Sequence, residues 1–143
     1  SLKPGSADSE KEERPCPETL IADFSSKFAN IPMIQASFRI VAPPKKRDEL
    51  VDVLLRLKGP TEVTRGCRAC QILQDVEDEC VLTYLVRWDT EQELEEHLRS
   101  ERFRRLLPYI EMSVEPPQVD FSTIDEIRGI EYLVAALSAR LDE

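Results

Sequence analysis

The stretch VLTYLVRWDTEQELEEHLRSERFRRLLPY, residues 81–109, holds the only tryptophan and the only histidine of the chain. It opens with residues 81–88, a run of β-branched, aromatic and aliphatic side chains of strand length. Thr90 and Glu93 then form a Thr-x-x-Glu capping box, in which each side chain can satisfy an unpaired backbone N–H of a first helical turn. The stretch therefore predicts a strand followed at once by a helix that begins at Glu91.

This helix is expected to turn His97 inward. Leu94, His97 and Leu98 stand at i, i+3 and i+4, the spacing of the apolar stripe that faces a protein core. Trp88 ends the preceding strand, and His97 follows about two turns up the helix, so both side chains are expected at the mouth of one pocket. Tyr84 has the strand parity of Trp88 and is expected on the same face of the sheet.

The composition bounds the class of protein. A length of 143 residues gives room for one ordinary domain and a tail. The hydrophobic content of 41% and the charged content of 33% are typical of a soluble protein, and no apolar run approaches the roughly 20 residues of a membrane span. The formal net charge of −9 disfavours binding to nucleic acid and to anionic membranes. We expect the N-terminal segment to hold no intact secretory signal, because it has no apolar region behind a basic start. Cysteines that stay reduced would fit a cytoplasmic location, which we expect.

The cysteines at positions 16, 67, 70 and 80 include one Cys-x-x-Cys pair, Cys67 and Cys70. A redox pair works at a helix N-terminus, whereas this pair falls in a predicted strand, where i and i+3 point to opposite faces. A structural zinc site needs a second short pair, which the sequence lacks. We therefore interpret these cysteines as buried small hydrophobes and predict that Cys67 and Cys70 are not bonded to each other.

The remaining elements follow from periodicity and from Pro and Gly breaks. Residues 1–31 are expected to form an N-terminal arm with a short helix at 17–28, and residues 32–143 one folded domain. A first strand, 33–42, is expected to turn Ile34, Ala36, Phe38 and Ile40 to one face, and a helix, 45–58, to stop at Gly59-Pro60. A strand at 67–75 forms a hairpin with the strand 81–88. Ser100 is expected to cap a helical piece with Phe103, Leu106, Leu107 and Ile110 inward, before a strand through Val119, Phe121 and Thr123 and a helix after Gly129.

The order β-α-β-β-α-β is that of the ferredoxin-like unit, an α+β fold with one antiparallel sheet. Helices can cover one face of such a sheet. The other face is expected to carry apolar side chains and to meet another surface.

These features resemble the antibiotic biosynthesis monooxygenase family of small dimeric α+β barrels. The likeness rests on Gly66-Cys67 opening a strand, on the hairpin CQILQDVEDECVLTYLVRW, and on the words TEQELEEHL and SERF. It covers about residues 32–141. Family members often carry a glutamate two residues before the Trp and a second histidine just before the Phe, whereas this chain has Val86 and Arg102 there.

The resemblance implies a homodimer, joined through sheet faces, that acts without metal or flavin. Its expected substrate is an electron-rich phenol, anthrone or hydroquinone, whose anion gives electrons to O2. His97 is expected as a general base or as a hydrogen-bond partner of an ionised substrate, and Trp88 as a flat wall for a ring system. Tyr84, Phe103, Leu107 and Phe38 are expected to line the substrate site.

Three alternatives stay open. A lone histidine and tryptophan on inward faces can be ordinary core residues. A non-catalytic binding or interaction module of the same fold is the second alternative, in which Arg102, Arg104 and Arg105 attract an anionic ligand. A haem-degrading branch of the fold adds an asparagine on the first strand, where this chain offers Gln35 and Ser37, so haem is the less favoured ligand.

Overall fold

This computed structural model describes residues 32–142 of the chain. The chain divides into two compact units: one is Pro32–Ile124, and the described part of the other is residues 125–142. The predicted arm and its short helix at 17–28 lie outside the described residues.

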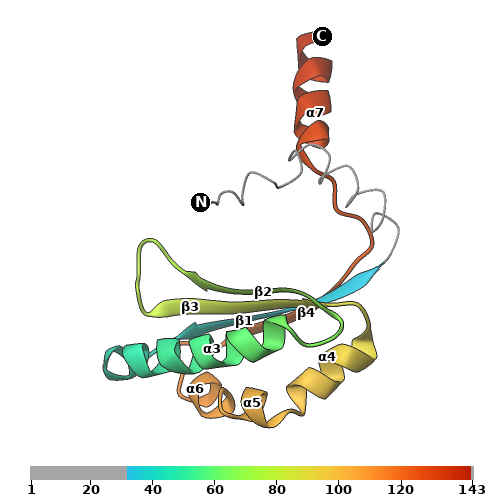
Figure 1. Cartoon of the computed structure of the whole chain (residues 1–143). Coiled ribbons are helices and arrows are strands. Elements are labelled where there is room, and N and C mark those ends of the chain that lie inside the picture. The colour runs from blue at the N-terminus through green and yellow to red at the C-terminus, as the bar shows by residue number, and fades with distance from the viewer. Residues whose placement is uncertain (1–31, 143) are drawn as a thin grey trace, which may run out of the picture. The chain divides into compact units, whose positions relative to one another are not determined.

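The first unit is built on one antiparallel sheet of four strands in the order β2-β3-β1-β4 (Figure 1). The strands are β1 (Met33–Val41), β2 (Cys67–Gln74), β3 (Val81–Trp88) and β4 (Gln118–Ile124). β1 lies between β3 and β4, and β2 forms the predicted hairpin with β3. This is the predicted α+β ferredoxin-like arrangement.

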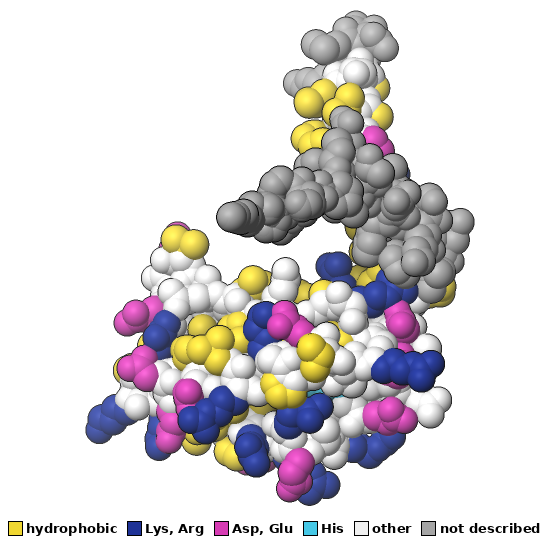
Figure 2. All heavy atoms as spheres, in the orientation of Figure 1, with side chains coloured by type: hydrophobic (Ala, Val, Ile, Leu, Met, Phe, Trp, Pro, Cys, Tyr) yellow, Lys and Arg dark blue, Asp and Glu magenta, His cyan; other side chains and the backbone are white. Residues whose placement is uncertain are grey.

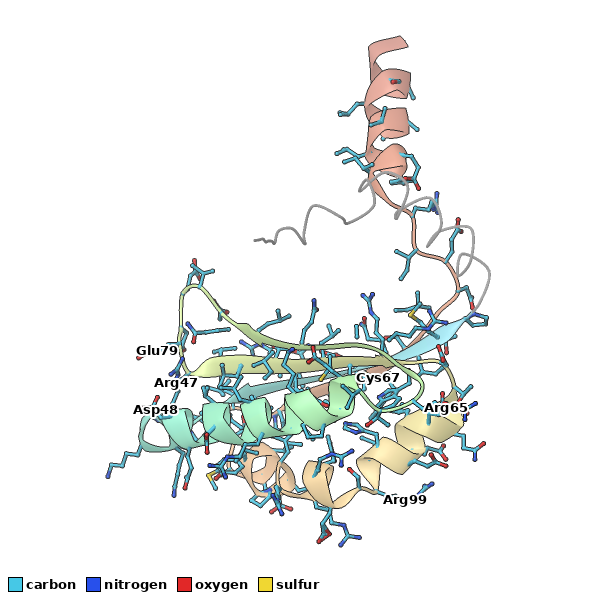
Figure 3. All side chains as sticks on the ribbon, viewed as in Figure 1. Arg47, Asp48, Arg65, Cys67, Glu79 and Arg99 are labelled. Carbon is cyan, nitrogen blue, oxygen red and sulfur yellow. The ribbon has the colours of Figure 1, made fainter. Side chains whose placement is uncertain are left out.

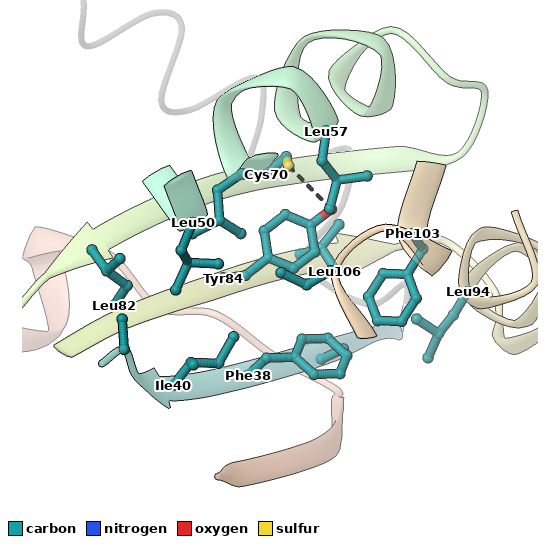
Figure 4. Packing of buried hydrophobic residues seen from close by; sticks show 14 of the residues in the cluster. Phe38, Ile40, Leu50, Leu57, Cys70, Leu82, Tyr84, Leu94, Phe103 and Leu106 are labelled. Atoms are coloured by element: carbon teal, nitrogen blue, oxygen red, sulfur yellow. Dashed lines mark hydrogen bonds between the residues drawn. The ribbon is translucent and has the colours of Figure 1, made fainter. Parts of the chain in front are cut away.

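The helices of this unit lie on one side of the sheet (Figure 1). They are the 3-10 turn η1 (Pro44–Lys46), α3 (Arg47–Glu62), α4 (Glu91–Leu98), α5 (Glu101–Arg104) and α6 (Leu107–Glu111). The buried core fills the space between them and the inner sheet face, where Phe38 is paired with Tyr84 and Ile34 with Trp88 (Figure 4). Alternation along the strands therefore selects the core, as the sequence predicts.

The sequence predicts that the helix α3 stops at Gly59-Pro60. In the structure α3 continues to Glu62. Pro60 lies in its last turn and has no N–H to donate to the carbonyl of Arg56, so the helix loses one backbone bond there. Side chains supply hydrogen bonds there: the buried hydroxyl of Thr61 donates to the carbonyl of Leu57 at 2.7 Å, and that of Thr64 donates to the carbonyl of Pro60 at 2.8 Å. Local hydroxyl groups thus carry the helix past the proline.

The outer sheet face, which carries none of these helices, also differs in part from expectation. Its central positions alternate with the buried ones, and most of them are polar: Gln35, Ser37, Arg39, Gln71, Thr83, Arg87, Asp120 and Ser122. Apolar side chains also lie on this face: Met33, Val41, Ala69, Leu73, Val81, Leu85 and Ile124. The outer face therefore carries apolar side chains, as predicted, but with polar ones among them, because period-two alternation identifies two faces and does not fix the polarity of the second.

The described part of the second unit contains α7 (Ile130–Asp142), in the place predicted for a C-terminal helix. Its described apolar side chains are exposed, among them Ile130, Leu133, Val134 and Leu137. No helix among residues 32–142 is both long and apolar enough to cross a lipid bilayer.

Candidate functional site

Trp88 and His97 come together at one end of the inner sheet face. Trp88 is the last residue of β3 and is 1% exposed, and His97 lies in α4 and is 5% exposed. Their ring centroids are 5.1 Å apart. The short connection brings them together, because the hydroxyl of Thr90 accepts the backbone N–H of Glu93 at 3.2 Å and starts α4 two residues after the strand ends.

Three aromatic rings surround the His97 imidazole. Besides Trp88, the ring of Phe103 lies 5.4 Å away and that of Tyr84 lies 6.1 Å away, centroid to centroid. Phe103 is positioned by a second cap, in which the hydroxyl of Ser100 accepts its backbone N–H at 3.2 Å. The prediction that His97 lies on the inward stripe of its helix is confirmed.

One nitrogen of His97 is engaged inside the core. Its Nε2 lies 3.0 Å from the hydroxyl of Tyr84, which also receives a weak hydrogen bond from the thiol of Cys70 at 3.6 Å (Figure 4). Nδ1 has no hydrogen-bond partner among residues 32–142 and is not among their fully buried unpaired atoms, so it keeps access to solvent.

Burial keeps these groups neutral. It lowers the pKa of His97 to about 4, with a smaller contribution from the nearby Arg102 guanidinium. Burial raises the pKa of Tyr84 and of Cys70, so both retain their hydrogen atoms near neutral pH. At neutral pH, His97 is therefore an uncharged imidazole that carries one N–H and one acceptor nitrogen.

A pocket of about 100 Å³ opens beside these two rings. Besides Trp88 and His97, its lining consists of polar side chains from α4, from α5 and from the loop before β2: Thr64, Arg65, Glu93, Glu96, Ser100 and Arg102. Figure 3 labels Arg65 on that loop, close to α4. The Nε1–H of Trp88 is buried and has no hydrogen-bond partner among the described residues.

The other predicted site residues do not line this pocket. Tyr84, Phe38 and Phe103 are 0%, 3% and 4% exposed and pack behind it, as the core around His97. Leu107 was expected to point inward, but it is 43% exposed on α6. The helical piece after Ser100 breaks into α5 and α6, and this break turns Leu107 outward.

Most of the polar pocket residues were not expected there from the sequence. Glu93 lies four residues before His97 and Ser100 three residues after it, so helical spacing predicts that both lie on the side of His97. Glu96 directly precedes His97, and this spacing gives no such indication. Arg65 and Thr64 come from a loop, and no local pattern predicts where a loop folds.

Gly66 lets the loop approach α4 closely. Its φ is +91°, a conformation that side chains other than hydrogen disfavour, and an added Cβ would lie 2.3 Å from the carboxyl carbon of Glu93. Glu93 also accepts a hydrogen bond from the Thr90 hydroxyl at 3.1 Å. The carboxylate in the pocket wall is therefore held from two sides.

The cysteines of the Cys-x-x-Cys pair are both free, as predicted. The reason given for this prediction is wrong, because a β-bulge between Cys67 and Ala69 turns Cys67 and Cys70 to the same sheet face, opposite Trp88 and Val86. Burial raises the pKa of Cys67 to about 11, so its thiol is a poor nucleophile near neutral pH.

The family assignment rests on the sequence of the folded unit. The model of the antibiotic biosynthesis monooxygenase family matches residues 33–108, more than half of the chain. The chain belongs to the antibiotic biosynthesis monooxygenase family. The match includes the strand, helix and pocket residues described above, from β1 to the start of α6.

Solved structures agree with this family in fold. A conserved protein from Methanosarcina mazei Go1 is 22% identical, with a TM-score of 0.59 over 71% of this chain and 99% of that one. A Caulobacter crescentus protein assigned to the antibiotic biosynthesis monooxygenases is 18% identical, with a TM-score of 0.58 over 73% of this chain and 99% of that one. No curated protein is significantly similar to the chain. At these identities, the structural likeness establishes the fold alone.

Proposed function

We propose that this member of the antibiotic biosynthesis monooxygenase family oxidises a small, electron-rich phenol or hydroquinone with O2, without a metal or an organic cofactor. The observation that carries the proposal is the pocket in which the Trp88 indole, with its unpartnered N–H, meets the neutral imidazole of His97. An aromatic wall and hydrogen-bond donors in a largely buried site suit the anion of such a substrate.

The chemistry asks little of the protein. The ionised phenol gives electrons to O2, a ring carbon that carries hydrogen becomes a carbonyl, and the second oxygen atom leaves as water. The phenol thereby becomes a quinone, and O2 is the only oxidant needed. Trp88 and His97 would orient the ring and stabilise the charge on its oxygen.

The size of the pocket favours a single ring. A dry cavity of about 150 Å³ holds benzene in other proteins, and pockets for drug-sized ligands reach about 300–1,000 Å³. At about 100 Å³ and open to solvent, this pocket suits one substituted ring that protrudes through the mouth. Polycyclic anthrones and haem are too large for it as it stands.

Oxygen uptake tests this proposal. Protein treated with a chelator and then dialysed should consume O2 in the presence of single-ring phenols or hydroquinones, and heavy-isotope O2 should leave one labelled atom in the quinone product. A rate equal to that of the protein-free solution across the whole panel would exclude the enzymatic function.

A binding module of the same fold is the second candidate. It is supported by Val86, which is 0% exposed in the core at the position where family members often carry a glutamate, so no carboxylate is present there to assist proton transfer. Ligand binding at Trp88 without any oxygen uptake would favour this candidate.

A further inference from the structure

We propose that the Trp88–His97 pocket binds its ligand as an oxyanion, a carboxylate or a phenolate on a single aromatic ring, and that Tyr84 sets this preference by holding His97 as a hydrogen-bond donor. This inference deepens the proposed function and rests on it only for the reaction that follows binding. The positioning residue is Tyr84, which acts through His97.

The first step concerns the hydrogen of the Tyr84 hydroxyl. Its near partners are His97 Nε2 at 3.0 Å, the Cys70 sulfur at 3.6 Å and the Thr61 hydroxyl, whose own hydrogen goes to the carbonyl of Leu57 at 2.7 Å. A neutral imidazole nitrogen is a stronger acceptor than a hydroxyl oxygen or a thiol sulfur. The arrangement with the best bonds therefore has Cys70 donating to the Tyr84 oxygen and Tyr84 donating to Nε2.

The second step follows from the valence of imidazole. A neutral ring whose Nε2 accepts a hydrogen bond must carry its own hydrogen on Nδ1. Nδ1 has no partner among residues 32–142 and keeps solvent access, and His97 lines the pocket. The group that His97 offers to a ligand is accordingly an N–H donor, and not the lone pair of a general base.

A second donor lies beside it. Trp88 is 1% exposed, yet its Nε1–H has no hydrogen-bond partner among the described residues. Buried N–H groups are nearly always paired, so an unpaired one in a pocket wall indicates an acceptor supplied by a ligand. An indole can only donate. Two residues that line one small pocket thus each carry a neutral donor without a partner among the described residues, an arrangement that suits an oxyanion.

The charged residues of the pocket agree with this assignment. Arg65 and Arg102 line it, and neither has an ion-pair partner among residues 32–142. The carboxylates of Glu93 and Glu96 also line it, but they already accept hydrogen bonds, from Thr90 at 3.1 Å and from Gln92 at 3.5 Å. The lining therefore holds two arginines and two glutamates, and an oxyanion would pair with the arginines.

The tautomer can be read directly, because the chain has a single histidine. Nitrogen-15 NMR of the histidine-labelled full chain at neutral pH should show Nδ1 protonated and Nε2 unprotonated. Tyr84→Phe removes the donor and should shift the ring toward the other tautomer, while circular dichroism checks that the variant remains folded. An Nε2-protonated ring in the wild-type protein would overturn the assignment of His97 as a donor.

Binding can be followed by the fluorescence of the single tryptophan, Trp88, without any turnover. Benzoate and 4-nitrophenol serve as the carboxylate and phenolate probes, with benzamide and nitrobenzene as their neutral counterparts. At least one anion should bind about tenfold or more tightly than its neutral counterpart, as expected for charge-assisted hydrogen bonds. Bound 4-nitrophenol should show the absorption of its phenolate, and the stronger of the two anions identifies the source of the oxyanion.

Arginine variants locate the effect. Arg102→Gln and Arg65→Gln should each weaken anion binding several-fold and leave the neutral probes unchanged. Arg104→Gln, the matched control, removes the same charge from α5 outside the pocket lining. Equal affinity for anionic and neutral probes, or an equal loss in Arg104→Gln, would refute the oxyanion site. If O2 uptake with neutral phenols persisted in that event, the proposed function would stand without this inference.

Discussion

At the scale of single residues, His97 illustrates what sequence can and cannot predict. Helical spacing placed it inward, and strand parity placed Trp88 and Tyr84 on the same face, because both periodicities are local. The sequence offered no means of knowing that the Tyr84 hydroxyl bonds to His97, 13 residues away. Tyr84 was therefore expected to touch substrate, whereas it is fully buried behind the pocket.

The buried imidazole makes stability depend on pH. Burial lowers the pKa of His97 from 6.5 to about 4, so the unfolded chain binds more protons than the folded protein within this range. Stability should therefore fall as the pH falls through this window, by a total on the order of 3 kcal/mol. Urea unfolding at about pH 7 and at about pH 5 should show a steeper loss for wild type than for His97→Gln; identical slopes would contradict a neutral, buried His97.

Removing the ring should cost both stability and turnover. His97→Ala should destabilise the protein by about 2–3 kcal/mol, because three aromatic rings lose a packing partner. Oxygen uptake per folded molecule should fall about 10²–10³-fold, the effect of losing one donor to a developing oxyanion. Leu98→Ala, in the same helix but outside the pocket lining, should lose stability alone. Unchanged turnover in folded His97→Ala would make His97 structural.

At the scale of elements, capping signals were the most reliable part of the sequence. Thr90 and Ser100 both accept backbone N–H groups, since a cap depends on residues within one turn. The carboxylate of Glu93 accepts the Thr90 hydroxyl and not the backbone N–H that the capping box predicts. Pro60 was expected to end α3, but the helix continues to Glu62, and the hydroxyl groups of Thr61 and Thr64 form hydrogen bonds with its last turn. The bulge in β2 left no recognisable mark, because it depends on how two strands pair.

The junction between β3 and α4 should be sensitive to its cap. Thr90→Ala removes the acceptor of the Glu93 N–H and should lower the free energy of unfolding by about 1 kcal/mol. Ser122→Ala in β4, an exposed hydroxyl without a hydrogen bond recorded among the described residues, should change it by less than about 0.5 kcal/mol. Chemical denaturation of both variants measures the difference, and equal stability would show that the cap is dispensable.

At the scale of the whole molecule, the order of elements was enough to predict the fold, because the ferredoxin-like unit is one of few ways to close β-α-β-β-α-β. The surface was less predictable. Basic and acidic side chains are interspersed over the side of the first unit seen in Figure 2. Exposed apolar side chains lie on α7 and on β4, where Phe121 is 54% exposed, and also on other elements and loops of the first unit: Leu55, Val63, Leu73, Val76, Leu107, Met112 and Val114.

We expect a homodimer in solution at micromolar concentration, with ~2,000 Å² or more of total buried area. Because the outer sheet face carries Arg39, Arg87 and Asp120, a dimer joined there should weaken at high salt. Leu85→Asp on that face should shift sedimentation toward the monomer, whereas Leu55→Asp on α3, 57% exposed, should not. A wild-type monomer at micromolar concentration would refute the dimer.

The bulge at Arg68 also limits how the length of this strand can vary. Cys67 and Ala69 pair with the adjacent residues Trp88 and Arg87, so deleting Arg68 would remove the bulge and leave both cysteines on their present face. Deleting a residue between Ala69 and Gln74 would instead shift the sidedness of one part of β2 relative to β3, turning a buried side chain such as Cys70 toward water or a polar one such as Gln71 toward the core. Insertions and deletions in descendants of this sequence should therefore accumulate at Arg68 and in the 75–80 loop and spare residues 69–74.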